Sequence, residues 1–213
     1  MRSAARAPAF RRRLLGWYTR HARTLPWRGE RSPYAVLVSE IMLQQTQVAR
    51  VLDYYPRFLA RYPTIEDLAA ASDDAVRESW EGLGYYARAR NLHATARRVV
   101  ADHAGVLPSA PEALRRLPGI GRYTAGAVAS LAYSARVPAV DTNAERVLAR
   151  VFGLRRGTSR TRRVWSIAAA LVERGRPEDL NQALMDLGAT VCVARRPRCG
   201  GCPVRTVCAS YRA

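Results

Sequence analysis

The stretch Leu117–Asn143, LPGIGRYTAGAVASLAYSARVPAVDTN, decides the fold. Pro118 disfavours helical geometry in the residue before it, so one helix is expected to end here. Gly119 and Gly121 are expected to adopt backbone conformations closed to other residues and to expose their amides. Those amides open the next helix, where free N–H groups and the helix dipole attract an anion. The stretch predicts two helices joined by an anion-binding hairpin.

The charge of the chain indicates which anion. Its 213 residues include 35 basic and 17 acidic ones, a formal net charge of +18. Such an excess favours a polyanionic partner, so a duplex phosphate is the expected ligand of the hairpin. The alternative for the hairpin is an ordinary helix junction, and the alternative for the basic charge is the surface bias of a GC-rich genome. Tyr123 and Asp141 just downstream favour the nucleic-acid interpretation of the hairpin. All 35 basic residues are arginine, which excludes any mechanism that needs a lysine amine.

Length and hydropathy set the class of protein. Hydrophobic residues make up 48% of the chain, which is typical of one or two globular domains. No apolar run is long enough to span a membrane, and the arginine-rich N-terminus lacks the apolar core of a secretory signal. We therefore expect a cytoplasmic, nucleoid-associated protein of bacterial type, with no membrane partner, a monomeric state and reduced cysteines.

Helical periodicity and caps run through the whole chain, whereas β-alternation and repeats are missing, so the sequence predicts an all-α fold. Ser109 to Glu112 has the capping-box pattern. His93 and His103 are expected at the surface or as caps. The expected helices cover residues 10–22, 33 to about 43, 48–62, 64–68, 72–80, 88–103, 111–117, 122 to about 133, 144–152, 161–172 and 177 to about 191.

Two short polar or aromatic stretches suit contact with bases. Gln44, Gln45 and Thr46 follow the helix that carries Glu40, and glutamine amides pair with base edges. A solvated helix end is the alternative. Tyr85 follows two glycines, which suits a ring inserted into a base stack, with a covered helix junction as the alternative.

The four cysteines lie close together near the C-terminus. Cys192, Cys199, Cys202 and Cys208 have the spacing C-x6-C-x2-C-x5-C. Four thiolates in so short a segment of a reduced protein indicate a metal or cluster site, with disulfides as the alternative. The spacing alone leaves zinc and an iron–sulfur cluster open, although zinc more typically shows two CxxC pairs.

Taken together, these segments resemble one family over nearly the whole chain. LPWR, SEIMLQQTQV, GLGYYARARNLH, LPGIGRYTAGAVASLAY, VDTNAERVLARVFG and the cysteines are similar to those of the helix–hairpin–helix DNA glycosylases related to endonuclease III, most of all the MutY-type adenine glycosylases. The resemblance implies a six-helix barrel at 29–136 with the hairpin motif at about 112–130. A [4Fe–4S] domain is implied at 1–28 and 137–213, with the active site in the cleft between the two domains.

The resemblance also implies roles for single residues. Glu40 matches the catalytic glutamate, which protonates the leaving purine and then orients water, and Asp141 matches the aspartate that stabilises the sugar cation. Asn143 matches the partner of that aspartate. Tyr123 occupies the position where bifunctional relatives carry a nucleophilic lysine, which implies base excision without strand cleavage. A surface charge or an ordinary helix cap is the alternative for each carboxylate.

DNA contacts and the target follow from the same resemblance. Duplex DNA with a mismatched or damaged base is the implied partner, with the base flipped out. The cysteines are implied as the cluster ligands. The implied DNA and pocket residues are Gln44, Gln45, Thr46, Tyr85, Leu117, Gly119, Gly121 and Arg122, with Arg28 and Arg31 near the adenine pocket.

One departure from the family leaves the target base open. MutY-type enzymes usually have a further domain that recognises 8-oxoguanine, and this sequence ends five residues after Cys208. The first hypothesis is release of adenine opposite 8-oxoguanine or G, and the second is release of T or U opposite G. A damage-binding protein without turnover is a third, against which Glu40 and Asp141 argue. A lyase is excluded for want of lysine.

Overall fold

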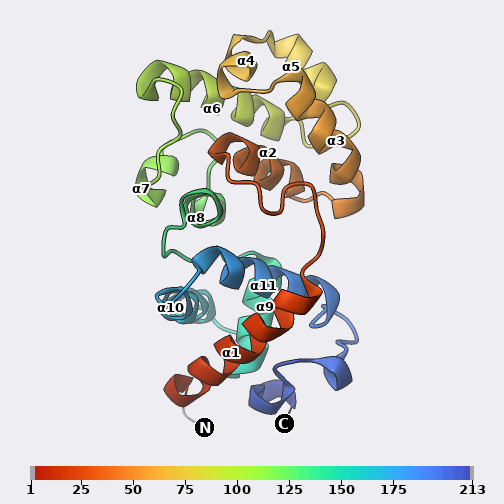
Figure 1. The fold of residues 1–213 in the computed structure, drawn as a ribbon, viewed down its shortest axis with the longest axis vertical. Coiled ribbons are helices and arrows are strands. Elements are labelled where there is room, and N and C mark those ends of the chain that lie inside the picture. The colour runs from red at the N-terminus through yellow and green to blue at the C-terminus, as the bar shows by residue number, and fades with distance from the viewer. Residues whose placement is uncertain (1–2, 212–213) are drawn as a thin grey trace. The chain divides into compact units, whose positions relative to one another are not determined.

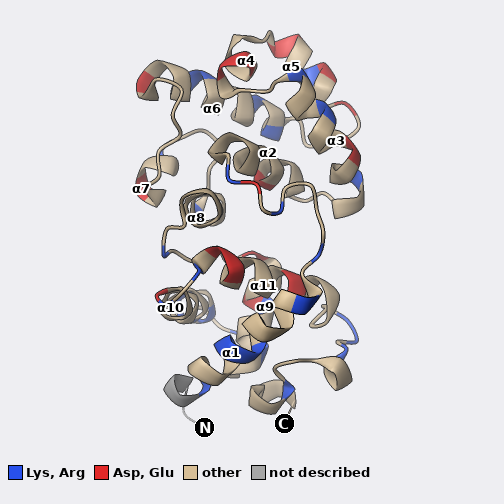
Figure 2. Ribbon diagram, in the orientation of Figure 1, with Lys and Arg blue, Asp and Glu red and all other residues tan. Residues whose placement is uncertain are grey.

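The computed structural model describes residues 3–211, and all regular structure in that range is helical, which confirms the predicted all-α class (Figure 1). The chain divides into two compact units, Thr24–Tyr133 and a second one that joins Met1–Arg23 to Ser134–Ala213. Both units carry arginines on their helices and loops (Figure 2). Within the described range no helix has the length and apolar character that crossing a membrane requires.

The unit Thr24–Tyr133 is built around one buried helix. Helix α2 packs against α3, α6 and α8. Its sequence PYAVLVSEIML is apolar almost all round, as expected of a helix inside a core. Ser32 caps its start by accepting from the Ala35 amide, with Pro33 at the first helical position, as the sequence predicts. The helices of this unit are α2 Pro33–Leu43, α3 Val48–Arg61, α4 Ile65–Ala70, α5 Asp73–Ser79, α6 Ala87–His103, α7 Pro111–Leu114 and α8 Arg122–Tyr133.

The other unit packs the first helix against the last part of the chain. Helix α11 contacts α1, α9 and α10, and Phe10, Leu14, Leu148 and Leu184 lie in its core, each at most 1% exposed. Three short 3-10 turns follow α11. Cys199 begins the first turn, and Cys202 and Cys208 directly follow the first and second turns. The helices and turns of this unit are α1 Ser3–His21, α9 Thr142–Phe152, α10 Arg160–Val172, α11 Pro177–Thr190, η1 Cys199–Gly201, η2 Arg205–Val207 and η3 Ala209–Tyr211.

One predicted helix start and one predicted capping box are wrong. Helix α1 begins at Ser3 rather than at residue 10, although Pro8 lies inside it. The capping box predicted at Ser109 is absent, because Pro111 occupies the first helical position and makes Ala110 the cap residue, which has no side-chain acceptor. A capping box does form at Thr64, whose side chain and backbone exchange hydrogen bonds with Asp67.

Two further expectations need correction. Gly119 has φ +72 and Cβ there would lie 2.7 Å from Cβ of Asn91, but Gly121 has no positive φ and open space around a Cβ. Only Gly119 is therefore required by backbone geometry. His93 is not at the surface: it is 4% exposed, because α6 turns it inward to face Asp73 at the start of α5, 3.1 Å away.

Candidate active site and metal centre

A buried carboxylate lies in the central helix of the unit Thr24–Tyr133. Glu40 is one turn from the end of α2 and only 5% exposed. The hydroxyl of Tyr123, in the first turn of α8, donates a 2.6 Å hydrogen bond to Oε2 of Glu40. A buried carboxylate is retained in a core when polar groups satisfy it, and here a phenol does so. The structure thus joins two predicted site residues that are 83 positions apart.

Small residues on α8 allow this contact. Ala125, Gly126, Ala127 and Ala129 are fully or nearly buried, and helix spacing depends on the side chains at the contact. A second polar contact joins the same two helices, from the Gln44 amide to Oγ1 of Thr124 at 3.3 Å. Gln44, a predicted DNA contact, therefore uses its side-chain amide for a hydrogen bond inside the unit, and it is the cap residue at the end of α2.

A hydrogen bond from α6 fixes the hairpin that precedes α8. Oγ1 of Thr95 in α6 donates to the carbonyl of Pro118 at 2.8 Å. Leu117 is 4% exposed, so its side chain belongs to the core and only its backbone is placed to face a ligand. Gly121 and Arg122 are exposed at the start of α8. The exposed amide end of this helix is the part of the hairpin suited to a phosphate.

Two loops carry the other predicted DNA contacts of this unit. Gln45 is exposed with φ 55 and Tyr85 is 62% exposed with φ 51, so each is a non-glycine residue in the left-handed region. Thr46 is half-buried.

The predicted base-pocket residues lie in a third loop. Arg28 is half-buried and Arg31 is exposed. Oε1 of Glu30 shapes this loop by accepting from the amides of Arg31 and Ser32 at 2.8 Å.

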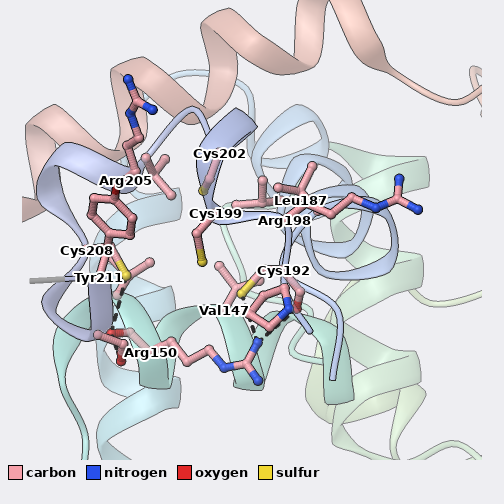
Figure 3. A pocket seen from close by; sticks show the side chains of 15 residues that line it. Val147, Arg150, Leu187, Cys192, Arg198, Cys199, Cys202, Arg205, Cys208 and Tyr211 are labelled. Atoms are coloured by element: carbon pink, nitrogen blue, oxygen red, sulfur yellow. Dashed lines mark hydrogen bonds between the residues drawn. The ribbon is translucent and has the colours of Figure 1, made fainter. Parts of the chain in front are cut away.

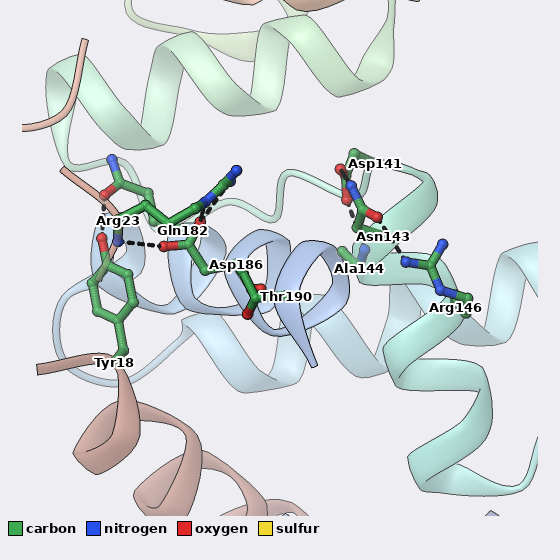
Figure 4. A network of polar contacts seen from close by, with 9 residues as sticks. All are labelled: Tyr18, Arg23, Asp141, Asn143, Ala144, Arg146, Gln182, Asp186 and Thr190. Atoms are coloured by element: carbon green, nitrogen blue, oxygen red, sulfur yellow. Dashed lines mark hydrogen bonds and ion pairs between the residues drawn. The ribbon is translucent and has the colours of Figure 1, made fainter. Parts of the chain in front are cut away.

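The second carboxylate lies at the start of α9 in the other unit. Asp141 is the cap residue, and its Oδ1 accepts from the Ala144 amide at 2.6 Å. Nδ2 of Asn143 donates to Oδ2 of Asp141 at 2.9 Å (Figure 4). A helix N-terminus and a side-chain amide thus both donate to this carboxylate, which suits a negative charge.

The Asp141 contacts continue to the cysteine segment. Nη2 of Arg146 donates to Oδ1 of Asn143 at 2.7 Å, and its Nε donates to the carbonyl of Cys192 at 2.9 Å. Gly188 lets α11 approach, since a Cβ there would lie 2.6 Å from Cβ of Asn143. The segment before Asp141 is also fixed, because the buried Asn181 bonds both Ala139 and Val137.

The four predicted metal ligands line one cavity. Cys192, Cys199, Cys202 and Cys208 are free thiols around a space of about 250 Å³, with apolar walls such as Val147 and Leu187 (Figure 3). Within residues 3–211 no three potential ligands gather to hold a single ion. The cavity instead has room for a group of several atoms among separated thiols, which fits a cluster.

Basic groups and burial set the chemistry of that cavity. Nη1 of Arg150 lies 3.4 Å from Sγ of Cys192 and donates to the carbonyl of Val193 at 2.8 Å, while Cys208 donates to the carbonyl of Arg150. Burial raises the pKa of the Cys202 thiol, and the other three cysteines add to the effect. Metal binding at Cys202 therefore has to displace a proton that burial holds on the thiol.

Sequence reasoning missed the residues that hold this machinery in place. Arg88 is buried and Arg146 and Arg150 are half-buried, but no local pattern separates these three from the other arginines among the 35. Asp186 is fully buried and accepts from the Arg23 backbone and side chain (Figure 4). Their roles depend on partners that are distant in the sequence.

Known protein families match two segments of the chain. Residues 38–173, more than half of the sequence, match the model of the HhH-GPD superfamily base excision DNA repair proteins. The chain belongs to this superfamily. Residues 192–208 match the iron–sulfur binding domain of endonuclease III, which confirms the predicted iron–sulfur cofactor, and the four cysteines would hold the [4Fe–4S] cluster. This HhH-GPD chain thus combines the superfamily domain and the metal centre.

Several relatives are named as adenine DNA glycosylases. The mouse protein of that name is 48% identical over 96% of this chain, and the protein of Mycobacterium tuberculosis strain H37Rv is 48% identical over 90%. The matches cover 42% of the mouse protein and 64% of the mycobacterial one, so this HhH-GPD chain spans about two fifths and about two thirds of their lengths.

Solved structures share the fold over the full chain. A thermostable thymine-DNA glycosylase superposes with a TM-score of 0.90 and 31% identity, covering 99% of this chain and 98% of that one. An endonuclease III trapped in a covalent complex with DNA gives 0.84 at 24% identity, covering 100% and 98%, which is a likeness of fold.

Proposed function

We propose that this chain is a DNA glycosylase that releases mispaired adenine from duplex DNA by hydrolysis. The observation that carries the proposal is the 48% identity to adenine DNA glycosylases over 96% of the chain. The net charge of +18 supports a polyanionic partner, and the proposed contacts to it are the exposed hairpin amides and the loops of Gln45 and Tyr85.

The two carboxylates divide the work in this proposal. Adenine is a poor leaving anion, so Glu40 in its acid form donates a proton to the departing base as the bond from the sugar breaks. Asp141 stabilises the positive sugar, held by the Ala144 amide and Asn143. Glu40, now a carboxylate, takes a proton from the water whose hydroxyl adds to the sugar carbon. The products are free adenine and an abasic sugar, and Glu40 is again protonated.

The residue beside Glu40 suits base release without strand cleavage. Lyase chemistry of the Schiff-base kind needs an amine, and the 213 residues contain no lysine. Tyr123 offers a phenol that is already bonded to Glu40. The cluster, when bound, supplies a cross-link among the C-terminal turns, and Cys192, Cys199, Cys202 and Cys208 would hold it.

A second target has one observation in its favour. A solved thymine-DNA glycosylase superposes on this chain with a TM-score of 0.90 at 31% sequence identity. Release of T or U opposite G is therefore the competing activity. A pyrimidine leaves as a more stable anion and has less need of the acid that Glu40 provides.

Single-turnover base release on one panel of duplexes distinguishes the proposed adenine glycosylase activity from the thymine or uracil glycosylase activity. The panel contains A opposite 8-oxoguanine, A opposite G, T opposite G and U opposite G. We expect adenine release by the wild type and its loss in Glu40→Gln and Asp141→Asn, with Glu173→Gln, an exposed glutamate at the end of α10, as the matched control. Release of T or U with adenine untouched would replace the proposal by the second activity. Borohydride trapping of a covalent adduct would overturn the absence of lyase chemistry.

A further inference from the structure

Arg88 is an arginine that faces inward from the first turn of α6. It is 8% exposed, whereas Arg90 two residues later is exposed on the same helix. Burial lowers the pKa of Arg88, but a guanidinium starts so high that it stays charged. A buried charge of this kind is costly unless it is hydrogen-bonded on several sides.

One side of the guanidinium closes the end of α2. Nη1 donates to the carbonyls of Ile41 at 3.0 Å and Met42 at 2.8 Å, and also to the carbonyl of Gln44. The last carbonyls of a helix have no partner within the helix and lie at the negative end of its dipole. Arg88 therefore fixes where α2 stops and how the turn that carries Gln44 and Gln45 leaves it.

The other side reaches the loop that carries Tyr85. Nη2 donates to Oγ1 of Thr46 at 3.0 Å, to the carbonyl of Gly84 at 3.1 Å and to that of Leu83 at 3.4 Å. Nε1 of the buried Trp80 donates to the same Gly84 carbonyl at 3.2 Å. A single side chain thus joins residues 41–46 to residues 83–84.

Both loops hold a strained residue at the point where a ligand would meet them. Gln45 and Tyr85 have φ 55 and 51, conformations that persist in non-glycine residues only when their surroundings impose them. The guanidinium carbon of Arg88 lies 5.7 Å from the centroid of the Tyr85 ring and 5.5 Å from that of Trp80. The exposed Tyr85 ring therefore rests on the same group that holds its backbone.

We infer that Arg88 is a positioning residue that holds the Gln44–Thr46 turn and the Tyr85 loop as one preformed unit for insertion into DNA. This inference rests on the proposed function. Arg88 contributes no phosphate contact, because its two terminal nitrogens are already engaged by six acceptors inside the protein. Its loss should impair recognition of a disrupted base pair while general attraction to DNA persists.

The test measures insertion separately from base release. Wild-type protein is bound to a duplex with a tetrahydrofuran abasic analogue opposite G and 2-aminopurine beside it, and to the matching undamaged duplex. Arg88→Gln should lower the preference for the abasic duplex about tenfold, since several charged hydrogen bonds are lost. It should also reduce the gain in 2-aminopurine fluorescence to the level of Tyr85→Ala. Affinity for the undamaged duplex should stay close to that of the wild type.

Two controls distinguish positioning from charge and from misfolding. Arg90→Gln removes one exposed charge from the same helix and should weaken both duplexes alike, leaving the preference intact. Arg88→Lys keeps the charge, but a lysine ammonium cannot span both loops, so it should also lose preference. That variant decides the question if Arg88→Gln fails to fold by circular dichroism.

A double variant provides the strictest outcome. Tyr85→Ala and Arg88→Gln should be strongly non-additive in the preference for the abasic duplex, because both remove the same preformed unit. Additive effects, or a preference unchanged in either Arg88 variant, would overturn the inference. The abasic duplex holds no base to release, so failure of adenine release with this result intact would sink the proposed function alone.

Discussion

The Tyr123 hydroxyl donates a 2.6 Å hydrogen bond to Oε2 of Glu40, a carboxylate that is 5% exposed inside the unit Thr24–Tyr133. This bond fixes the orientation of the acid before any substrate arrives. Tyr123→Phe keeps the ring and removes the donor. We expect single-turnover release of adenine to slow by up to about tenfold, the upper size of one ordinary hydrogen bond to the acid form of Glu40.

A second tyrosine of α8 provides the control for this variant. Tyr133 also donates one hydrogen bond, to the carbonyl of Leu107, so Tyr133→Phe loses the same kind of contact away from Glu40. Its release rate should equal that of the wild type. Equal slowing in the two variants would show that the Tyr123 bond acts only through stability of the unit.

The close approach of α9 and α11 depends on a glycine. A Cβ at Gly188 would lie 2.6 Å from Cβ of Asn143 and 2.9 Å from its carbonyl oxygen, a backbone group that cannot move alone. Gly188→Ala should lower the free energy of unfolding by about 1–3 kcal/mol, as overpacking of a core does. Urea denaturation measures the change.

Gly16 makes a matched comparison for that substitution. It is exposed in the second half of α1, and no side chain or backbone beyond its own stretch of helix lies within 4 Å of the place that an alanine methyl would occupy, so Gly16→Ala adds only helix propensity. It should raise the free energy of unfolding by about 0.5–1 kcal/mol. Opposite signs for the two alanines are the expected result, and two losses of equal size would contradict the packing argument.

The two sites with capping sequences should differ in the same measurement. Oγ1 of Thr64 accepts from the Asp67 amide at 3.1 Å, so Thr64→Ala should lower the free energy of unfolding by about 1 kcal/mol. Ser109 precedes a helix whose cap residue is Ala110, and Ser109→Ala should change it by less than about 0.5 kcal/mol. A larger loss at Ser109 would place the helix start one residue earlier.

Local signals in the sequence are sufficient for the helical class and for the place of Glu40 in its helix. Ser32 and Pro33 mark the start of α2, so Glu40 necessarily falls near its end, and Asp141 precedes a helical run as a cap residue does. The cysteine spacing likewise marked the metal centre, although the choice of an iron–sulfur cluster came from the family resemblance. These features depend on neighbours within a few residues, and the structure has α2, Glu40 and the Asp141 cap as predicted, whereas the start of α1 and the capping box at Ser109 are wrong.

The contacts that arrange the site depend on tertiary packing, and the sequence did not reveal them. The acceptors of Arg88 lie at positions 41–46 and 83–84, and Arg146 bonds Asn143 and Cys192, which are 49 positions apart in the sequence. Burial of His93 arises because α5 packs on α6. Charge and periodicity cannot distinguish such a residue from one at the surface.

The buried His93 should make stability depend on pH. Its pKa is lowered, mainly by burial and further by Arg97, with Asp73 opposing the shift. The folded chain therefore binds fewer protons at this site than the unfolded chain does, and stability rises with pH. The contribution is complete above the unfolded value of 6.5 and is lost progressively as the pH falls from there toward the lowered folded value.

Urea denaturation between about pH 7.5 and 5.5 covers the start of this window. His93→Gln should flatten the loss of unfolding free energy over that interval, whereas His103→Gln, at the exposed end of α6, should keep the wild-type slope. Identical slopes for the wild type and His93→Gln would mean that the protonated ring is accommodated by Asp73 at no cost to the fold.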